Sequence, residues 1–374
     1  MSGDDLGEMN DEFDVNHFDD FSDSALFEAI DCDMNMASEE VDGKEVMIYA
    51  LDFANDLLVI EDFVRDAVFT TDAAFAIDEH RSRRVATINK WFDRYHRSLT
   101  ALSSICRPQY QYSPRVELVF SLAREFDFLS DLSRNPNALV GCAEEILNGS
   151  RTIVADCYND LIERLRGEYK KRKIGRKISK RIENAKNNYV DACHYVDWIM
   201  ARFARIAVVR LDVGYRKEDT VETTLECAMN DYRKLIQKRR GKQSVFGEMV
   251  GYVAKLEYSS VKGYHFHFML FFNGAKKRNH SYLAEQIGTY WRDEVTLGAG
   301  TYYNCNRSMN KYKRCGIGLV DHWDAAKRSN LLFALSYLTK SEQYVLVKTK
   351  SGQRTFFKGH KRKHSQKGGR PRRK

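Results

Sequence analysis

One short apolar run constrains the fold of this chain more than any other feature. The run is "GYHFHFMLFF", residues 263 to 272, and it follows a second strand-like segment, "SVFGEMVGYVAKLEY", across the turn "SSVKG". The two segments predict a β-hairpin. Because side chains alternate along a strand, His265 and His267 lie on one face together with Met269, and their Cα atoms are about 6.6 Å apart. Two imidazoles at that spacing can turn toward one ion between them.

The position of the turn decides which residues of the first strand face the histidines. If the chain turns within residues 259 to 263, Glu257 faces His265 and Lys255 faces His267. Two imidazoles and one carboxylate, with positions left for water or substrate oxygens, form a reasonable site for Mg²⁺ or Mn²⁺ acting on a phosphate, and zinc is chemically possible. The alternative is that both histidines are hydrogen-bonded in a polar corner of the sheet; the facing carboxylate favours the metal site.

The segments around the hairpin predict an α+β domain over residues 204 to 345. "RIAVVRLDVGY" is β-branched and strand-like, and it comes before an amphipathic helical pattern. Helices are expected over residues 219–240, 281–295 and about 324–343. A short strand is expected over residues 316–321, after a loop-rich stretch. The order β-α-β-β-α-β is that of the ferredoxin-like split βαβ unit, with an antiparallel sheet.

Residues 44 to 203 have apolar residues at three- and four-residue intervals and predict an all-helical region. Within it, "RLRGEYKKRKIGRKISKR" (164 to 181) is dense in Lys and Arg and has a single Glu. This density makes the segment a candidate for contact with phosphates. A solvated helix end is the alternative.

The two ends of the chain differ in charge. Residues 1 to 43 hold 15 acidic residues and no Lys or Arg, and we expect a disordered acidic arm. Residues 346 to 374 hold 12 basic residues and no acid. Here "VLVKTK" and "QRTFFK" predict a closing hairpin, followed by a basic tail. The net charge of the whole chain is +8, which favours nucleic acid as a partner ahead of an anionic membrane.

Composition also bears on the compartment. No stretch approaches the run of about 18 apolar residues that a membrane-spanning helix needs, and the acidic start is unlike a signal peptide. We therefore expect a soluble cytoplasmic protein with no membrane partner. The eight cysteines form no CxxC pair, so reduced structural thiols are expected. Cys305, Cys315 and His322 are a weak alternative zinc site, because the usual paired spacing is missing.

A tyrosine on the last predicted helix is a candidate nucleophile. In "AAKRSNLLFALSYLTKSEQY" the leucines form the buried stripe, which leaves Tyr337, Lys340 and Tyr344 on a roughly common flank. Lys340 lies one turn after Tyr337 and supplies a cation that can hold a phosphate, stabilise charge in the transition state or lower the pKa of the tyrosine. Tyr344 lies two turns on and is the weaker candidate.

The stretch "TYYNCNRSMNKYKRCG" (301 to 316) interleaves aromatic and basic residues, as single-strand binding surfaces do. An exposed loop with some aromatic packing is the alternative. The candidate nucleic-acid contacts are Tyr302, Tyr303, Arg307, Lys311, Tyr312, Lys313 and Arg314.

Five stretches together carry a resemblance to a known family: "VVRLDVGY", "LEYSSVKGYHFHFMLFF", "YWRDEV", "CGIGLV" and "LSYLTK". Over about residues 200 to 360 the chain resembles the inovirus-type gene-two replication proteins, which also occur in prophages. That family is similar to the HUH endonucleases, named for a His-hydrophobic-His motif. The helical region and the acidic arm lie largely outside the resemblance.

The resemblance implies a rolling-circle replication initiator in a bacterial host cytoplasm, working on origin or single-stranded DNA with a possible host helicase or polymerase. It implies that His265, His267 and Glu257 bind Mg²⁺ or Mn²⁺, and that Tyr337 with Lys340 nicks one strand and keeps its 5′-phosphate. Some phage initiators use a second tyrosine three or four residues later, where this chain has Lys340 and Ser341. Rival readings are a non-cleaving DNA-binding regulator, an RNA-binding protein and a structural metal protein.

Overall fold

We analysed a computed structural model of the chain, which describes most of residues 36 to 361. The described residues are 36–41, 44–49, 53–80, 83–99, 110–125, 153–220, 222–238, 245–259, 262–312, 314–340, 345–347 and 354–361. The expected acidic arm lies outside this part except for residues 36–41. The basic tail beyond residue 361 also lies outside it.

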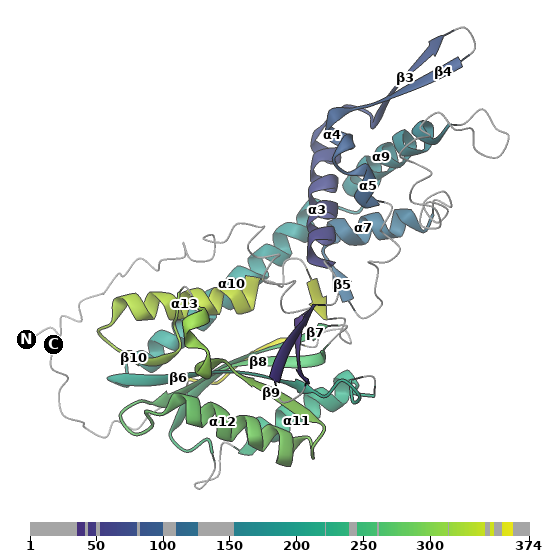
Figure 1. The fold of residues 1–374 in the computed structure, drawn as a ribbon. Coiled ribbons are helices and arrows are strands. Elements are labelled where there is room, and N and C mark those ends of the chain that lie inside the picture. The colour runs from purple at the N-terminus through teal and green to yellow at the C-terminus, as the bar shows by residue number, and fades with distance from the viewer. Residues whose placement is uncertain are drawn as a thin grey trace, which may run out of the picture.

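A six-stranded antiparallel sheet forms the centre of the larger lobe (Figure 1). The order along the sheet is β10-β6-β8-β7-β12, and β9 pairs with the other half of the β6 edge that β10 occupies. The strands are β6 (Arg205–Tyr215), β7 (Met249–Ser259), β8 (Gly263–Asn273), β9 (Gly300–Asn304), β10 (Gly318–Asp321) and β12 (Phe356–Lys358). The fold is therefore α+β with an antiparallel sheet, as the sequence predicts.

Helices cover both faces of this sheet. The alternation of the strands sends Leu211, Phe266 and Phe268 to one face, where α11 (Leu225–Lys238) and α12 (His280–Tyr290) pack. Met269 and Phe271 point to the opposite face, which is covered by the second half of α10 (Ile174–Met200) and by α13 (Ala325–Lys340). After α12 the chain continues in a π-helical turn, η1 (Trp291–Val295). His265 and His267 lie on the face of α10 and α13 because they alternate with Phe266 and Phe268.

A helical arm projects from the sheet (Figure 1). Its core is aromatic, with the Phe63, Phe92 and Tyr158 side chains buried together. Its helices are α3 (Phe53–Phe69), α4 (Lys90–Asp93), α5 (His96–Leu99), α7 (Pro114–Ala123), α9 (Val154–Lys171) and the first turns of α10.

The helix α10 joins the arm to the sheet. Its first residue, Ile174, belongs to the core of the arm, whereas Ala185 and the residues after it belong to the core under the sheet. A continuous helix of 27 residues is about 40 Å long. Lys173, just before it, has a φ of 52°, a left-handed conformation that separates α9 from α10. The arm and the sheet are therefore connected by a rigid element.

The region before β6 is not all helical, contrary to the sequence expectation. β3 (Phe75–His80) and β4 (Arg83–Ile88) form an antiparallel pair, and β1 (Met36–Val41) pairs with β2 (Lys44–Tyr49). The β3–β4 register places Phe75 opposite Ile88 and Ile77 opposite Ala86, which is a period of two within a segment taken as helical. Residues 36–41 likewise form a strand in a stretch expected to be disordered.

The closing hairpin predicted after residue 345 is wrong. β11 (Val345–Val347) pairs with β5 (Tyr110–Tyr112) of the arm, and β12 pairs with β7. The edge of β7 offers unpaired backbone groups to the returning chain, and Phe357 packs its ring 4.7 Å from that of Tyr232. The edge of β7, with an apolar contact beside it, is thus a better pairing partner for β12 than β11 is.

The stretch after α12 was expected to be rich in loops, but residues 300 to 304 form strand β9. Tyr302 explains the difference, because its ring lies so close to Gly288 of α12 that a side chain there would overlap it. This contact packs the strand against α12, while its backbone pairs with β6. None of the helices in the described part of the chain has the length and apolar composition needed to cross a bilayer.

Candidate metal centre

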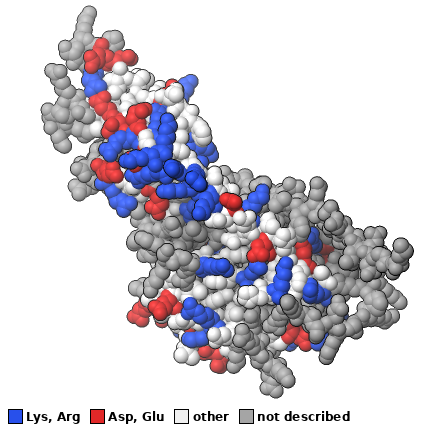
Figure 2. All heavy atoms as spheres, turned by 180° about the vertical axis from the view of Figure 1, so that it is seen from behind, with Lys and Arg blue, Asp and Glu red and all other residues white. Residues whose placement is uncertain are grey.

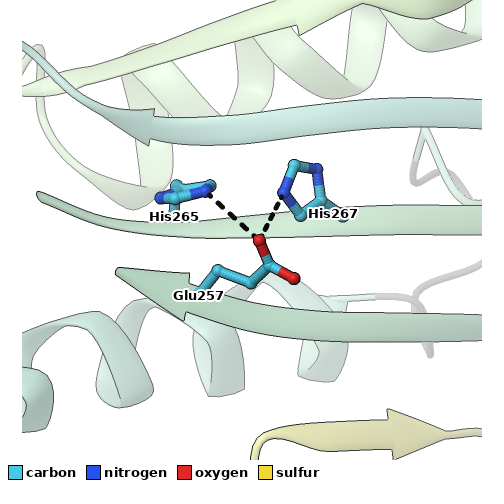
Figure 3. Close-up of side chains that lie close together, drawn as sticks. All are labelled: Glu257, His265 and His267. Atoms are coloured by element: carbon cyan, nitrogen blue, oxygen red, sulfur yellow. Dashed lines mark ion pairs between the residues drawn. The ribbon is translucent and has the colours of Figure 1, made fainter. Parts of the chain in front are cut away.

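The β7–β8 hairpin brings Glu257, His265 and His267 together as predicted. Glu257 is the register partner of His265, and Lys255 is the partner of His267. The Oε2 atom of Glu257 lies 3.9 Å from Nε2 of His265 and 3.4 Å from Nε2 of His267 (Figure 3). One possible ligand atom from each residue falls within 4.8 Å of the others, and this is the one such group of metal-binding residue types in the described chain.

His265 is held with its Nε2 atom facing the carboxylate. Its Nδ1 atom lies 3.0 Å from the carbonyl oxygen of Gly263, which can only accept a hydrogen bond. The proton of the neutral ring therefore sits on Nδ1, and Nε2 carries a lone pair. This Nε2 atom is buried and has no hydrogen-bond partner among the described residues. A buried lone pair directed at a carboxylate is unfavourable unless a cation lies between them.

His267 is oriented by a carboxylate that the sequence reasoning missed. Asp212 of β6 is the register partner of His267, and its Oδ1 atom lies 2.8 Å from His267 Nδ1. Both histidines thus have an acceptor beside Nδ1 and turn Nε2 toward Glu257. Such an outer acceptor is the usual companion of a metal-binding histidine. The available signal was an aspartate inside the β-branched run "RIAVVRLDVGY".

Charge interactions in the cluster shift its titrating groups. Burial works to raise the pKa of Asp212 and of Glu257, but the charge of His267 and its hydrogen bonding to each carboxylate outweigh burial and lower both pKa values. Burial, with the charge of His267, lowers the pKa of His265 to about 3. At neutral pH the centre therefore offers carboxylates and a neutral His265 imidazole, which are forms that bind metal, whereas the charged His267 must release its Nε2 proton to become the third ligand.

The donor set fits a divalent cation. Two imidazole nitrogens and one carboxylate oxygen converge from two adjacent strands, and both imidazoles are buried. Three protein ligands leave positions open for water or a substrate oxygen. The alternative zinc set is not assembled. Cys305 Sγ lies 3.7 Å from Asp212 Oδ2, while Cys315 and His322 contact the backbone carbonyls of Ile317 and Ala204.

Tyr337 lies on the same side of the sheet as the cluster. α13 packs on the face that carries His267, and the half-buried Tyr337 ring contacts that core. The guanidinium carbon of Arg210 is 5.7 Å from the centre of the Tyr337 ring, and its Nε atom is 3.9 Å from Asp212 Oδ1. A chain of contacts therefore leads from Tyr337 through Arg210 and Asp212 to His267.

The structure describes less of the two other residues in the predicted nucleophile segment, Lys340 and Tyr344. Lys340 is the last residue of α13, one turn after Tyr337, and its side chain lies outside the described part. Tyr344 lies outside it altogether. Leu331, Leu335 and Leu338 form the buried stripe of the helix, as expected.

The predicted nucleic-acid residues do not form one surface. Tyr302 donates to Glu285 of α12 on one side of the sheet, whereas Tyr303 contacts the core on the other side. Tyr303 is the register partner of Asp212, and the Lys311 ammonium lies 3.0 Å from its hydroxyl. Adjacent residues of a strand point to opposite faces, which accounts for this division.

The remaining members of that set divide in the same way. Arg307 forms an ion pair with Glu285, 3.1 Å away, on the side of α12. Tyr312 lies on the side of the metal cluster, with its ring centre 6.0 Å from the Arg210 guanidinium carbon, and burial raises its pKa. Arg314 covers Phe333 of α13, and Lys313 lies outside the described residues.

Comparison with known proteins places the chain in a family. The family model of the YagK/YfjJ C-terminal domain matches residues 168–359, just over half of the sequence. The chain belongs to the YagK/YfjJ C-terminal domain family. The matched region contains α10, the whole sheet, α13 and every residue of the metal cluster, whereas most of the arm precedes it. No curated protein and no solved structure matched the chain.

Proposed function

We propose that this protein is a metal-dependent DNA-nicking replication initiator, which cleaves one strand by transesterification with Tyr337 as the nucleophile. The observation that carries the proposal is the convergence of His265 Nε2, His267 Nε2 and a Glu257 oxygen, with each Nδ1 atom beside an acceptor. The type of reaction is proposed from the His-hydrophobic-His spacing and from the resemblance to the inovirus-type gene-two replication proteins. The proposed domain is a split βαβ unit, in keeping with β8 lying between β6 and β7 in the sheet.

In this proposal the cluster residues bind Mn²⁺ or Mg²⁺. When bound, the ion draws charge from a non-bridging oxygen of the phosphate that is cut. Imidazole ligands suit Mn²⁺ better than Mg²⁺, which prefers oxygen. Asp212 holds the ring of His267 in place, and the Gly263 carbonyl does the same for His265, so neither ring needs to reorient when the ligand set is completed.

The proposed reaction is a transesterification, in which the phosphate is transferred from a 3′ oxygen of the DNA to the tyrosine oxygen. The Tyr337 oxygen attacks the phosphorus and loses its proton, a Tyr–O–P bond forms, and the bond to the 3′ oxygen breaks. That oxygen takes up a proton and leaves as a 3′-hydroxyl, which can prime synthesis. Arg210 lies beside the Tyr337 ring and can stabilise the negative charge that develops on the phenol oxygen.

The test is a search for a covalent adduct. Purified protein with Mn²⁺ or Mg²⁺ is incubated with single-stranded and supercoiled DNA of the element that carries the gene, then analysed by denaturing electrophoresis. We expect a nicked strand joined by its 5′ end to the protein. Tyr337→Phe should lower adduct formation by at least about 10³-fold with DNA binding retained. Tyr282→Phe, an exposed tyrosine of α12 on the opposite face, is the matched control.

Two outcomes would contradict the proposal. DNA binding without any cleavage or adduct, with either metal, would make the protein a non-cleaving regulator. Loss of the adduct in Tyr344→Phe with the adduct intact in Tyr337→Phe would move the nucleophile to the segment after α13.

A further inference from the structure

The first half of α10 carries a row of exposed cations on one side. Lys173 immediately precedes the helix, and Arg176, Lys177 and Lys180 follow at intervals of three, one and three residues, all exposed. At 3.6 residues per turn these four positions fall within about 100° of arc and about 10.5 Å of rise. Continuing the same side along the helix leads to two exposed amides, Asn184 and Asn187. We call these six residues the α10 stripe.

The opposite side of the same helix is apolar and covered. Ile174 and Ala185 are buried in the cores of the arm and of the sheet lobe, and Tyr189 is buried beside Ala185. The stripe therefore faces away from the protein. Figure 2 shows Lys and Arg gathered on the arm when the molecule is seen from behind.

The stripe differs from the basic residues just before it, most of which are already paired. Arg166 binds Glu163, and Lys171 and Arg172 bind Glu168. In contrast, no acidic side chain in the described part of the chain forms an ion pair with Lys173, Arg176, Lys177 or Lys180. Four cations that have no acidic partner among the described residues lie on one short surface and repel one another, and a polyanion relieves that repulsion.

From this geometry we infer that the α10 stripe binds the phosphate backbone of double-stranded DNA. Duplex DNA carries about one negative charge per 1.7 Å of axis, so several phosphates lie within reach of a row about 10.5 Å long. Lysine, arginine and asparagine side chains are the usual phosphate contacts. Because α10 is rigid and also packs under the sheet, the bound duplex would keep a fixed distance from the metal cluster.

Two other polyanions fit the stripe less well. Single-stranded binding surfaces use aromatic side chains on which bases stack, and the stripe has none. A membrane-surface helix inserts apolar side chains beside its cations, but the apolar side of α10 is buried. Exposed Ile182 lies on the side of the helix away from the stripe.

The experiment measures binding of a short blunt duplex to the full chain by fluorescence anisotropy, between about 50 and 200 mM salt. The test variant is Arg176→Glu with Lys177→Glu and Lys180→Glu. The control reverses the same number of charges in the loop between β8 and α12, with Lys276→Glu, Lys277→Glu and Arg278→Glu. Thermal unfolding of all three proteins verifies that they are folded.

We expect the α10 variant to bind the duplex at least about tenfold more weakly, and the slope of log affinity against log salt to fall by about 3, because three phosphate contacts are lost. The control should retain most of the affinity and slope. Equal losses in both variants would show an effect of net charge only and would overturn the inference.

Other outcomes assign the stripe elsewhere. Unchanged duplex affinity, with lost binding to vesicles of anionic lipid, would make it a membrane surface. Unchanged duplex affinity with an increased hydrodynamic radius would assign it to the acidic residues 1 to 43 of the same chain. The inference does not depend on nicking. A protein that never forms the Tyr337 adduct, but binds duplex through the stripe, would refute the proposed function and leave this inference standing.

Discussion

The arm and the sheet lobe use charged residues in opposite ways. On the arm, most ion pairs lie at the surface, such as Lys171 with Glu168, one turn apart on a helix, and the buried carboxylate of Glu61 is paired with Arg115. In the sheet lobe, His265, His267 and Glu257 are drawn together between strands, with both imidazoles buried. The first arrangement costs the protein little, because water still solvates each charge. The second removes charges from water and is unfavourable unless something compensates for it.

The difference identifies where a specific ligand is needed. A surface ion pair is stable without a bound ligand, whereas a buried histidine nitrogen that faces a carboxylate is stabilised by a cation bound between the two. The comparison therefore predicts large effects of substitutions at the cluster, intermediate effects at the residues that orient it, and almost none at surface pairs of the arm.

The largest effect is expected for a ligand itself. Glu257→Gln removes the negative charge toward which both Nε2 atoms turn, and should weaken Mn²⁺ binding by more than about 100-fold. This loss exceeds the one typical of a residue that only hydrogen-bonds a metal ligand. Isothermal titration calorimetry measures the affinity. Glu248→Gln, an exposed carboxylate just before β7, is the control and should bind as the wild type does. Equal affinity in Glu257→Gln would remove Glu257 from the ligand set.

An intermediate effect is expected for Asp212→Asn. The amide oxygen can still accept a hydrogen bond from His267 Nδ1, but it lacks the negative charge that makes the imidazole a stronger ligand, so Mn²⁺ affinity should fall by about 10- to 100-fold with the fold intact. The control is Asp321→Asn on β10, where the carboxylate binds Arg205 at the first residue of β6 instead. Similar losses in both variants would indicate that β6 is disturbed rather than that His267 has lost its partner.

A smaller effect should appear in the pH dependence of stability without metal. Because the folded pKa of His265 is about 3 against an ordinary value of 6.5, the unfolded chain binds a proton below pH 6.5 that the folded chain does not. The free energy of unfolding therefore falls as the pH decreases, by about 2 kcal/mol between pH 7 and 5 from this residue alone. Urea unfolding should show that His265→Gln is less sensitive to pH in this window. If the free energy of unfolding depended on pH equally in the wild type and in His265→Gln, His265 would not be held neutral.

The smallest effect is expected on the arm. Glu168→Gln removes a carboxylate that pairs with Lys171 and Arg172 at the surface. Water and salt screen this interaction, so the melting temperature should remain nearly unchanged. A large drop would show that surface pairs support the arm more than the comparison allows.

Local chemistry made part of the molecule predictable. The hairpin register followed from one turn and a period of two, and it placed Glu257 beside the histidines as observed. Long-range partners could not be predicted in this way. β11 and β12 each have an apolar strand pattern. Their actual neighbours, β5 and β7, are distant in sequence, and the pairing depends on which strand edges are available in the folded protein.

The same limit applies to the site. Asp212 reaches His267 only because β6 pairs with β8, and Arg210 reaches Tyr337 only because α13 packs on that face. The basic and aromatic stretch shows the reverse case, since neighbouring residues in the sequence, Tyr302 and Tyr303, point to opposite sides of the sheet. Proximity in sequence predicts chemistry well within a hairpin and poorly across a sheet.

The central claim is that His265 and His267 bind one divalent ion together with Glu257. Pulsed electron paramagnetic resonance of the protein with one equivalent of Mn²⁺ tests it most directly, because the ion itself reports which nuclei surround it. The account predicts nitrogen couplings from two imidazoles, reduced to one imidazole in His265→Gln. A spectrum without nitrogen couplings, equal to that of hydrated Mn²⁺, would contradict it.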